Sequence, residues 1–362
     1  MTLRKLDDVI LFKDDCYLSF PNVIRKPDGG LLLAFRRAPD WQATFGHYTH
    51  VDPGSEAVVA ASADGGSTWS GLRTLHDDYL YGVQDPCLNL LGDGTIVATF
   101  FKWKVYDEGD VRGRRPSDHL VYGKWVGRFV GTFTSRSRDG GLTWDEPAPM
   151  SIEGAAVRGN AAELPDGSIV VVAYRMDPDH RLIVAKSRDR GRTWTHHATI
   201  AGSGDFDLDE TNVYRTDAGK LVAFIRTLDR DAATPKERRS PLFVAESFDD
   251  GDTWSAPKPT GLYTPSPFHA LRLQSGRVLL TYGYRVAPYG LRARLLEPEC
   301  GNVDEAEEVV LRDDGLGTDI GYSHAVQLPD GRILIVYYYY DEPKGVRYIA
   351  GTWCEEASVA VF

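Results

Sequence analysis

Ionisable and aromatic residues stand at fixed distances from six glycines of this 362-residue chain. The residues nine positions before the glycines are Phe20, Asp85, Arg158, Glu210, Pro267 and Tyr322. The arginines seven to nine positions after a glycine are Arg36, Arg175, Arg226 and Arg285. If each glycine is the turn of a β-hairpin, both sets lie at the same end of their hairpins, because the two strands run antiparallel. A ring of such hairpins would gather carboxylates, a tyrosine and arginines around one mouth, where an anionic ligand could be held.

Six segments with the order strand, turn, strand contain these glycines, which are Gly29, Gly94, Gly167, Gly219, Gly276 and Gly331. Asp, Ser and Gly at the turns favour tight reversals, because Gly adopts backbone angles that other residues resist. Nearly continuous aliphatic runs follow the turns at residues 31–35, 169–173, 221–225 and 333–336. Such runs indicate strands that are covered on both faces. Six hairpins of this kind predict the six blades of a β-propeller.

An eight-residue motif, Ser-x-Asp-x-Gly-x-Thr-Trp, occurs four times, at residues 62–69, 137–144, 187–194 and 247–254. Its Asp and Ser can bond back to nearby amides, and Thr-Trp suits the start of a strand. We interpret each of these Asp-boxes as a structural turn in the outer hairpin of blades one to four. Residues 295–304 are expected to turn in blade five without the motif, and residues 345–353 with 8–12 to complete blade six. The prediction is an all-β fold, a single six-bladed β-propeller domain over residues 1–362.

Three insertions interrupt the repeats. Residues 38–55 and 102–128 are candidate functional loops, because long ordered loops on a rigid scaffold commonly carry function. Residues 229–240 are charged and expected to be solvated. Three residues of metal-ligating types in the first insertion are His47, His50 and Asp52. A further ligand is not evident, so we expect no metal and no cofactor.

Composition limits the classes of partner. The formal charge of −11 argues against a nucleic acid or an anionic membrane surface, since both need basic patches. The N-terminal sequence has no apolar core with a cleavage site, and no apolar run reaches the length of a membrane span. We therefore expect a cytoplasmic protein, or a secreted one if a signal peptide was trimmed. The cysteines lack metal-ligand spacing and are interpreted as free thiols.

The Asp-boxes, the hairpins and several mouth residues resemble the non-viral sialidases, a family of glycoside hydrolases, over essentially the whole chain. In Gly-Tyr-Ser-His before the last hairpin, Tyr322 matches the family's nucleophile. Glu210, sixteen residues before Arg226, matches the base that activates it. Arg292, thirty residues before Tyr322, matches a second substrate-binding arginine. Asp52, four residues before an acidic strand residue, matches the acid/base, and Asp85-Pro86 resembles the Asn-Pro of blade two.

The resemblance implies a retaining exo-glycosidase acting on the terminal acidic sugar of a glycan or oligosaccharide. A neutral Tyr322 nucleophile avoids a repulsion of roughly 4 kcal/mol between two charges about 4 Å apart at an effective dielectric near 20. Glu210 would take its proton, and Arg226 and Arg292 would orient the substrate carboxylate. Asp52 would protonate the leaving oxygen. Further candidate substrate-binding residues at the mouth are Asp85, Arg36, Arg158, Arg285 and His50.

The sequence departs from the family at its first arginine. The family opens with Tyr-Arg-Ile-Pro, whereas this chain has Leu-Ser-Phe-Pro, so that Ser19 replaces the arginine. Arg36, Arg37 or Arg25 could reach in from nearby. The departure leaves two alternatives open: a hydrolase or lyase for another sugar such as a uronic acid, and a carbohydrate-binding propeller without catalysis.

Overall fold

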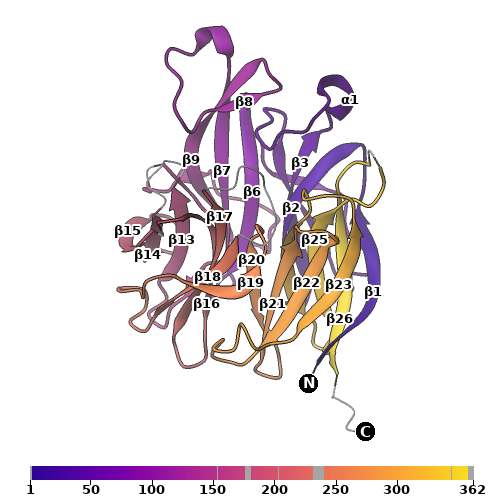
Figure 1. Cartoon of the computed structure of the whole chain (residues 1–362), viewed down its shortest axis with the longest axis vertical. Helices are drawn as coiled ribbons and strands as arrows, with labels where there is room; N and C mark the ends of the chain where they lie inside the picture. Colours follow the sequence, from indigo (N-terminus) through magenta and orange to yellow (C-terminus); the bar gives the residue numbers. More distant parts are fainter. Residues whose placement is uncertain are drawn as a thin grey trace.

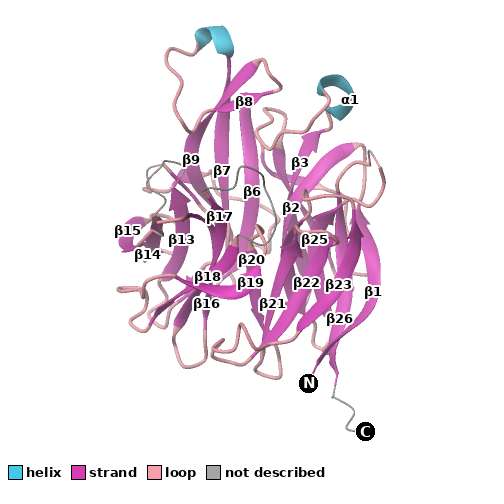
Figure 2. Ribbon diagram, in the orientation of Figure 1, coloured by secondary structure: helices cyan, strands magenta, loops and turns pink. Residues whose placement is uncertain are grey.

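The computed structural model describes residues 2–152, 154–175, 181–202, 204–230, 240–343 and 345–357. Six antiparallel sheets form the blades of a β-propeller (Figures 1 and 2), which confirms the predicted fold class. The helical segments of the described residues are α1 (Gln42–Phe45) and a 3-10 turn at Glu108–Asp110. Residues 231–239 of the predicted charged insertion lie outside the described residues.

Each blade presents its first strand to the centre and its fourth to the periphery. Blade one consists of β2 (Cys16–Arg25), β3 (Leu31–Pro39), β4 (Glu56–Ser62) and β5 (Arg73–His76). Blade two consists of β6 (Tyr81–Leu90), β7 (Ile96–Asp107), β9 (Trp125–Ser137) and β10 (Ala148–Pro149), with β8 (His119–Val121) beside β9. Blade three consists of β11 (Ala155–Ala156), β12 (Ala162–Glu163), β13 (Ile169–Arg175), β14 (Leu182–Ser187) and β15 (Thr195–Ile200).

The second half of the ring repeats this order. Blade four consists of β16 (Phe206–Arg215), β17 (Leu221–Asp229), β18 (Pro241–Ser247) and β19 (Lys258–Tyr263). Blade five consists of β20 (Phe268–Arg272), β21 (Val278–Tyr284), β22 (Tyr289–Leu296) and β23 (Glu308–Gly315). Blade six consists of β24 (Gly321–Gln327), β25 (Ile333–Tyr339), β26 (Tyr348–Ala357) and β1 (Thr2–Phe12).

The two ends of the chain close the ring within blade six. β1 pairs antiparallel with β26, and Asp8 stands opposite Thr352 in the register. The Thr352 hydroxyl donates to the Asp8 carboxylate at 2.7 Å. This pairing confirms the prediction that residues 345–353 and 8–12 complete the last blade.

The Asp-boxes are the outer turns of blades one to four, as predicted. In the first box, Asp64 accepts from the hydroxyls of Ser62 (2.8 Å) and Thr68 (2.6 Å). The other boxes repeat these bonds around Asp139, Asp189 and Asp249. The box glycine also packs on the preceding blade, since a Cβ at Gly141 would meet Leu32 of blade one at 2.5 Å. The boxes therefore join neighbouring blades.

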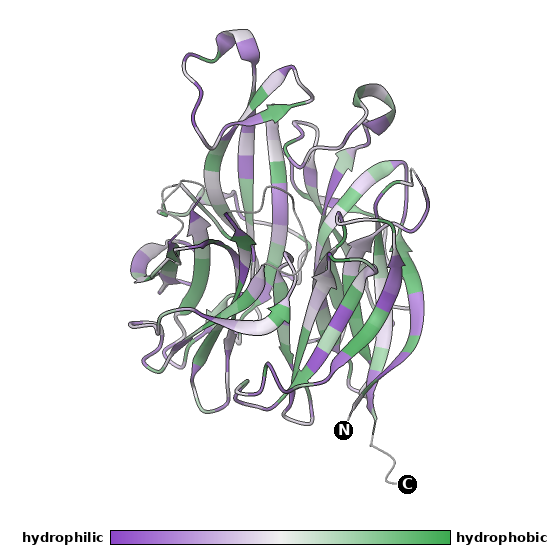
Figure 3. Cartoon of the chain, viewed as in Figure 1, coloured by the Kyte–Doolittle hydropathy of each residue, from purple (hydrophilic) through white to green (hydrophobic). Residues whose placement is uncertain are grey.

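Buried apolar residues from all six blades form the core between the sheets. Figure 3 shows hydrophobic residues, in green, along the strands. All seven residues of β25 are buried, as expected for a strand covered on both faces. The four cysteines are free thiols, and three of them are buried. In the described part of the chain no helix has the length and hydropathy of a membrane span.

The insertion at 102–128 is a raised β-ribbon rather than the predicted loop. β7 and β9 extend beyond the other strands and carry β8 at their tip (Figure 1). The insertion at 38–55 lies beside this ribbon, because Phe45 stacks on Tyr122 with ring centroids 4.4 Å apart. The two insertions form one wall above the mouth.

Four inner strands have a β-bulge at the same place. The ladder is irregular between Ser19 and Asn22, and equally at 84–87, 208–211 and 321–324. Three residues within the bulges adopt positive φ: Phe20 (56°), Asp85 (52°) and Tyr322 (51°). Such angles are uncommon for residues other than glycine and are concentrated at functional sites. The bulges thus direct the mouth residues toward the axis.

Gly159 allows blades three and four to approach closely beneath the mouth. A Cβ there would lie 2.0 Å from the carbonyl oxygen of Thr211, the residue that follows Glu210. We expect Gly159→Ala to destabilise the fold by about 1–3 kcal/mol, because the backbone must shift. Thermal unfolding measures this loss. Gly71→Ala is the matched control, since a Cβ there meets nothing within 4 Å; equal melting temperatures of the two variants would contradict the expectation.

Candidate active site

Tyr322, Glu210 and Arg226 meet at the central mouth, although they come from blades six and four. The Tyr322 hydroxyl donates a hydrogen bond to one oxygen of Glu210, and Arg226 donates to the other oxygen. Arg226 Nη1 also lies 3.2 Å from the Tyr322 hydroxyl. The structure therefore brings together three residues that the sequence predicted as nucleophile, base and substrate-binding group.

The surroundings set the protonation states of this group. Burial and the charge of Glu210 raise the pKa of Tyr322 well above its ordinary value, so the phenol is neutral. Burial alone would raise the pKa of Glu210, but the Arg226 charge and the bond from Tyr322 hold it below its ordinary value. An ionised carboxylate thus accepts a hydrogen bond from a neutral phenol. This is the starting arrangement for removal of the Tyr322 proton by Glu210.

A cavity of about 500 Å³ opens above these residues. Its polar lining includes Asp209, Glu210, Arg226, Arg285 and His50. Its aromatic lining includes Phe101, Trp103, Tyr174 and Tyr322. Trp103 comes from the β-ribbon, so the insertion that the sequence singled out contributes to the cavity wall. Polar groups on an otherwise aromatic wall are typical of carbohydrate and other small-molecule sites.

Arg158 and Arg285 hold the ring of Tyr322. Their guanidinium carbons lie 5.4 and 5.2 Å from the ring centroid, within the range of cation–π attraction. Arg158 is buried and donates to the carbonyl of Pro21 at 3.2 Å. Arg285 donates to the carbonyl of Ile320 at 2.9 and 3.0 Å and reaches the cavity. Of these two arginines, Arg285 alone lines the cavity and can contact a ligand there.

The structure places Arg292 away from the cavity, which corrects the predicted pairing of Arg292 with Arg226. Arg292 lies within β22, opposite Tyr282, and its guanidinium donates to the carbonyls of Arg312 and Pro288. Arg292 was predicted from its spacing along the chain. Spacing alone does not show on which strand an arginine lies, or how far along that strand. Arg285, which directly follows β21, lines the cavity, whereas Arg292 does not.

Ser19 and Arg36 stand opposite each other in the register of β2 and β3. Arg36 is fully buried and donates to the carbonyl of Thr49 at 3.3 Å. Its Nε and Nη1 atoms have no hydrogen-bond partner among the described residues. Arg36 is absent from the cavity lining, so the two arginines at the cavity are Arg226 and Arg285.

Asp52 lies just behind the cavity wall. Its Oδ2 accepts from the Tyr122 hydroxyl at 2.6 Å and its Oδ1 from the Gly54 amide at 2.7 Å. Asp52 as a whole residue is 2% exposed, and the cavity is lined by the residue before it, Val51. Tyr122 belongs to the β-ribbon, so this contact fixes the two insertions to each other.

His50 lines the cavity and leads to a polar network that the sequence did not indicate. Its Nε2 lies 3.0 Å from the Tyr17 hydroxyl and 3.5 Å from Asp319. Asp319 also accepts from Tyr338 at 2.9 Å and pairs with Arg347 at 2.8 Å. Although burial favours the neutral acid, bonds and charges from His50, Arg347 and Arg285 hold the pKa of Asp319 below its ordinary value. The network anchors His50 to blade six.

Asp85 is buried beneath the cavity, and its Oδ1 has no hydrogen-bond partner among the described residues. Burial raises the pKa of Asp85 to about 8. The charge of Glu210 also raises this pKa, whereas the charges of Arg158, Arg36 and Arg226 lower it. The carboxyl group is therefore neutral at neutral pH. Its positive φ of 52° adds a backbone angle that is uncommon for residues other than glycine.

Stability should fall with rising pH because of Asp85. A folded-state pKa above the unfolded value stabilises the protein at low pH, and this contribution is lost between about pH 4 and pH 8. Each pKa unit corresponds to about 1.4 kcal/mol. The free energy of unfolding of the wild type should fall between pH 5 and pH 8.5. That of Asp85→Asn should fall by several kcal/mol less over the same range. Urea unfolding at both pH values measures it, and parallel changes in the two proteins would contradict the raised pKa.

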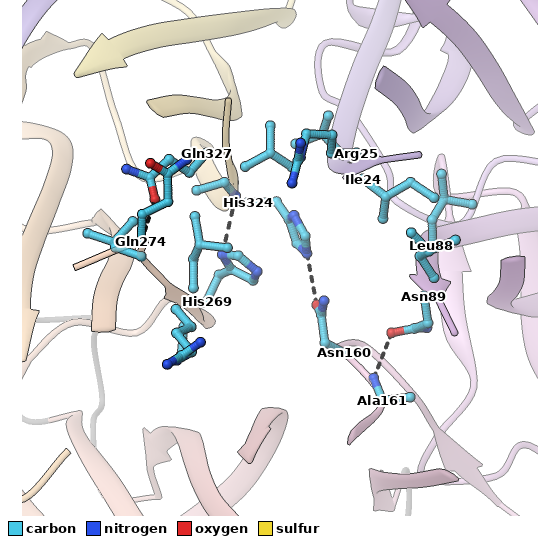
Figure 4. Close-up of a pocket in the computed structure, with 18 residues that line it drawn as sticks. Ile24, Arg25, Leu88, Asn89, Asn160, Ala161, His269, Gln274, His324 and Gln327 are labelled. Atoms are coloured by element: carbon cyan, nitrogen blue, oxygen red, sulfur yellow. Dashed lines mark hydrogen bonds between the residues drawn. The ribbon is translucent and has the colours of Figure 1, made fainter. Parts of the chain in front are cut away.

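A belt of Asn and His side chains joins the inner strands below the mouth. Asn22 Oδ1 accepts from the Leu88 amide of the next blade at 3.0 Å, and His269 Nδ1 accepts from the Ala325 amide at 3.2 Å. The rings of His269 and His324 lie against each other with centroids 3.6 Å apart and planes tilted by 33° (Figure 4), and burial lowers the pKa of both. A second cavity of about 480 Å³ lies along the belt. The belt fixes the relative heights of the strands that carry the mouth residues.

The structure does not gather His47, His50 and Asp52 around one point. The ring of His47 bonds to the carbonyl of Phe45, while His50 and Asp52 bond to Tyr17 and Tyr122. In the described ranges no group of three or more His, Cys, Asp or Glu side chains is placed to hold a metal ion.

The six blades and the central polar cavity define a sialidase-like β-propeller. The chain matches the family model described as a BNR repeat-like domain over residues 15–196 and 119–336, and it belongs to this family. No curated protein matches it. A protein of unknown function from Dyadobacter fermentans is similar at 36% identity, with a TM-score of 0.87 over 98% of this chain and 99% of that one.

Two more distant structures share the fold. The Hadza microbial sialidase Hz136 has 19% identity and a TM-score of 0.66 over 94% of this chain and 66% of that one. The α-L-arabinofuranosidase Arb93A from Fusarium graminearum has 11% identity and a TM-score of 0.62 over 97% and 98%. Propellers of this shape therefore include glycosidases for different sugars.

Proposed function

We propose that this protein is a retaining exo-glycosidase of the sialidase type that removes a terminal acidic sugar. The contact of the Tyr322 hydroxyl with Glu210, itself bound by Arg226, carries the proposal. A phenol bonded to an ionised carboxylate inside a cavity is an activated nucleophile. The same pair buried for structural reasons alone would not need to line a cavity of about 500 Å³.

The reaction follows from these positions. The Tyr322 oxygen attacks the anomeric carbon while its proton passes to Glu210, and the glycosidic bond breaks as a general acid of the site protonates the leaving oxygen. Water then attacks the same carbon and gives one proton back to that acid, while the bond from the carbon to Tyr322 breaks and the proton returns from Glu210 to Tyr322. Arg226 and Arg285 are the cationic side chains of the cavity, and they would hold the substrate carboxylate through charge-assisted hydrogen bonds.

A second candidate is a propeller glycosidase for a sugar other than sialic acid. Ser19 replaces the family's first arginine, and Arg36, which faces it, is buried outside the cavity lining. Two rather than three arginines at the cavity suit a substrate whose carboxylate is held less extensively, such as a uronic acid.

A panel of aryl glycosides tests both candidates. The panel contains α-sialosides, uronides and α-L-arabinofuranosides, with product configuration followed by NMR. Release of sialic acid with retained configuration would support the first candidate, and cleavage of uronides or arabinofuranosides without sialic acid release would select the second. Binding without product in a day-long incubation would overturn both and favour a carbohydrate-binding propeller.

A further inference from the structure

The second cavity, of about 480 Å³, lies at the end of the inner strands opposite to the mouth (Figure 4). Arg25, Arg272 and Gln327 are the last residues of β2, β20 and β24, and all three line this space, which we call the lower cavity. Tyr322, near the start of β24, lines the mouth instead. The volume of the lower cavity is typical of small-molecule sites. It is therefore a candidate binding site separate from the candidate active site.

The charged residues of this lining are arginines. Among the described residues that line the lower cavity there is no Asp or Glu, although the chain contains 52 acidic residues. Arg25 and Arg272 do line it. The charge of Arg158 also acts on this space, because it contributes to lowering the pKa of His269 and that of His324. In an acidic protein, such a local excess of positive charge favours an anionic ligand.

Arg25 is available to bind such a ligand. It is exposed, and it forms no hydrogen bond or ion pair with any described residue, whereas Arg272 pairs with Asp217. The sequence offered Arg25 as a replacement for the arginine missing at Ser19, but the structure places Arg25 at the end of β2 that is remote from the mouth. A free guanidinium group can bind a carboxylate or a phosphate through paired hydrogen bonds.

The lining also holds hydrogen-bond donors that have no partner among the described residues. His269 Nδ1 accepts from the Ala325 amide at 3.2 Å, and burial lowers the pKa of His269 to about 3, so its neutral ring carries the proton on Nε2. Asn160 Oδ1 accepts from His324 Nε2 at 2.9 Å, which leaves the Nδ2 group of Asn160 as a donor. Figure 4 shows Arg25, Asn160 and His269, which come from blades one, three and five, around the cavity. Acceptors of this lining are occupied, and donors are left over.

We propose that the lower cavity binds a small organic anion, a polycarboxylate or a sugar phosphate, with its anionic group at Arg25 and further acceptor oxygens at His269 and Asn160. Ile24 and Val326 also line the space, and apolar neighbours strengthen such bonds because they lower the local dielectric constant. An uncharged ligand would leave the guanidinium group without a counter-ion. The proposal does not depend on glycosidase activity, since in the described part of the chain the two cavities share no lining residue.

Isothermal titration calorimetry with citrate and with glucose 6-phosphate tests the proposal and distinguishes the two kinds of anion. Trimethyl citrate and glucose are their uncharged counterparts. We expect one of the anions to bind at least about tenfold more tightly than its counterpart, because a hydrogen bond to a charged group is stronger than one to a neutral group. Equal affinities within both pairs, or no binding of either anion at millimolar concentration, would overturn the proposal.

Two variants locate the bound anion. Arg25→Gln should weaken binding of the preferred anion by about tenfold or more, with glycoside turnover and melting temperature unchanged. Ala161→Trp, which places a large side chain in the lower cavity, should weaken it further.

Arg188→Gln is the matched control for Arg25→Gln. Arg188 is also exposed, but it belongs to the third Asp-box and lines neither cavity, so the affinity should stay within about twofold of the wild type. Equal affinities of Arg25→Gln and Arg188→Gln would place the anion elsewhere and overturn the assignment. Failure of the wild type to cleave any glycoside would overturn the proposed function and leave this assignment intact.

Discussion

Tyr322→Phe is expected to lower kcat by at least about 10³-fold while the fold is retained, because phenylalanine has no oxygen to attack the anomeric carbon. The ring keeps its packing between Arg158 and Arg285, so the melting temperature should change little. Steady-state kinetics on the best substrate of the glycoside panel, with thermal unfolding alongside, measures both quantities.

Tyr337→Phe is the matched control for this variant. Tyr337 is equally buried in blade six, but its hydroxyl bonds to Thr352, away from the cavity. Its loss should affect stability and leave kcat unchanged. If Tyr322→Phe kept more than about a tenth of the wild-type kcat, Tyr322 would not be the nucleophile.

Glu210→Gln should lower kcat by about 10²- to 10⁴-fold, because the amide cannot take the proton of Tyr322. Binding should suffer less than turnover, since Arg226 remains in the cavity. The substitution also removes the carboxylate that neutralises a buried guanidinium group. The expected cost in stability is about 1–3 kcal/mol rather than the 3–5 kcal/mol of an uncompensated buried charge, because Arg226 Nη1 also lies 3.6 Å from the carboxyl group of Asp209.

Glu246→Gln provides the comparison for Glu210→Gln. Glu246 pairs with Lys220 at 2.6 Å outside the cavity, so its loss should leave kcat intact. Kinetics and urea unfolding of the two variants separate the catalytic effect from the general effect of losing an ion pair. Equal kcat values would show that Glu210 has only a structural role.

The pattern of the sequence determined the architecture. Turn glycines, aliphatic runs and Asp-boxes are local signals, because a hairpin is formed by residues that are close in the chain. Repetition of these signals supplied the number of blades, and the pairing of residues 8–12 with 345–353 followed from the need to cover the edge of the last sheet. The raised ribbon at 102–128 was not predicted, since β7 and β9 depend on pairing with each other above the blade.

The predicted site residues fall into two groups: those predicted from the hairpin repeat and those predicted from spacing along the chain alone. Tyr322, Glu210 and Arg226 follow the hairpin repeat, and the repeat brought them together correctly. Arg292 was assigned from spacing alone, and the register of β22 turns it toward the carbonyls of blade five. The register of β3 likewise buries Arg36 opposite Ser19.

Only the tertiary structure decided which groups share protons. The approach of Asp209 to Arg226 could not be predicted from the sequence, because alternation places Asp209 on the opposite face from Glu210 and only the bulge in β16 brings both to Arg226. The protonation of Asp85, Asp209 and Glu210 depends on burial and on charges from other blades, which no local pattern encodes. The sequence by itself determined a ring of six blades with an arginine-rich mouth; the packing of the blades determined which side chains face the cavity and which carboxyl groups carry a proton.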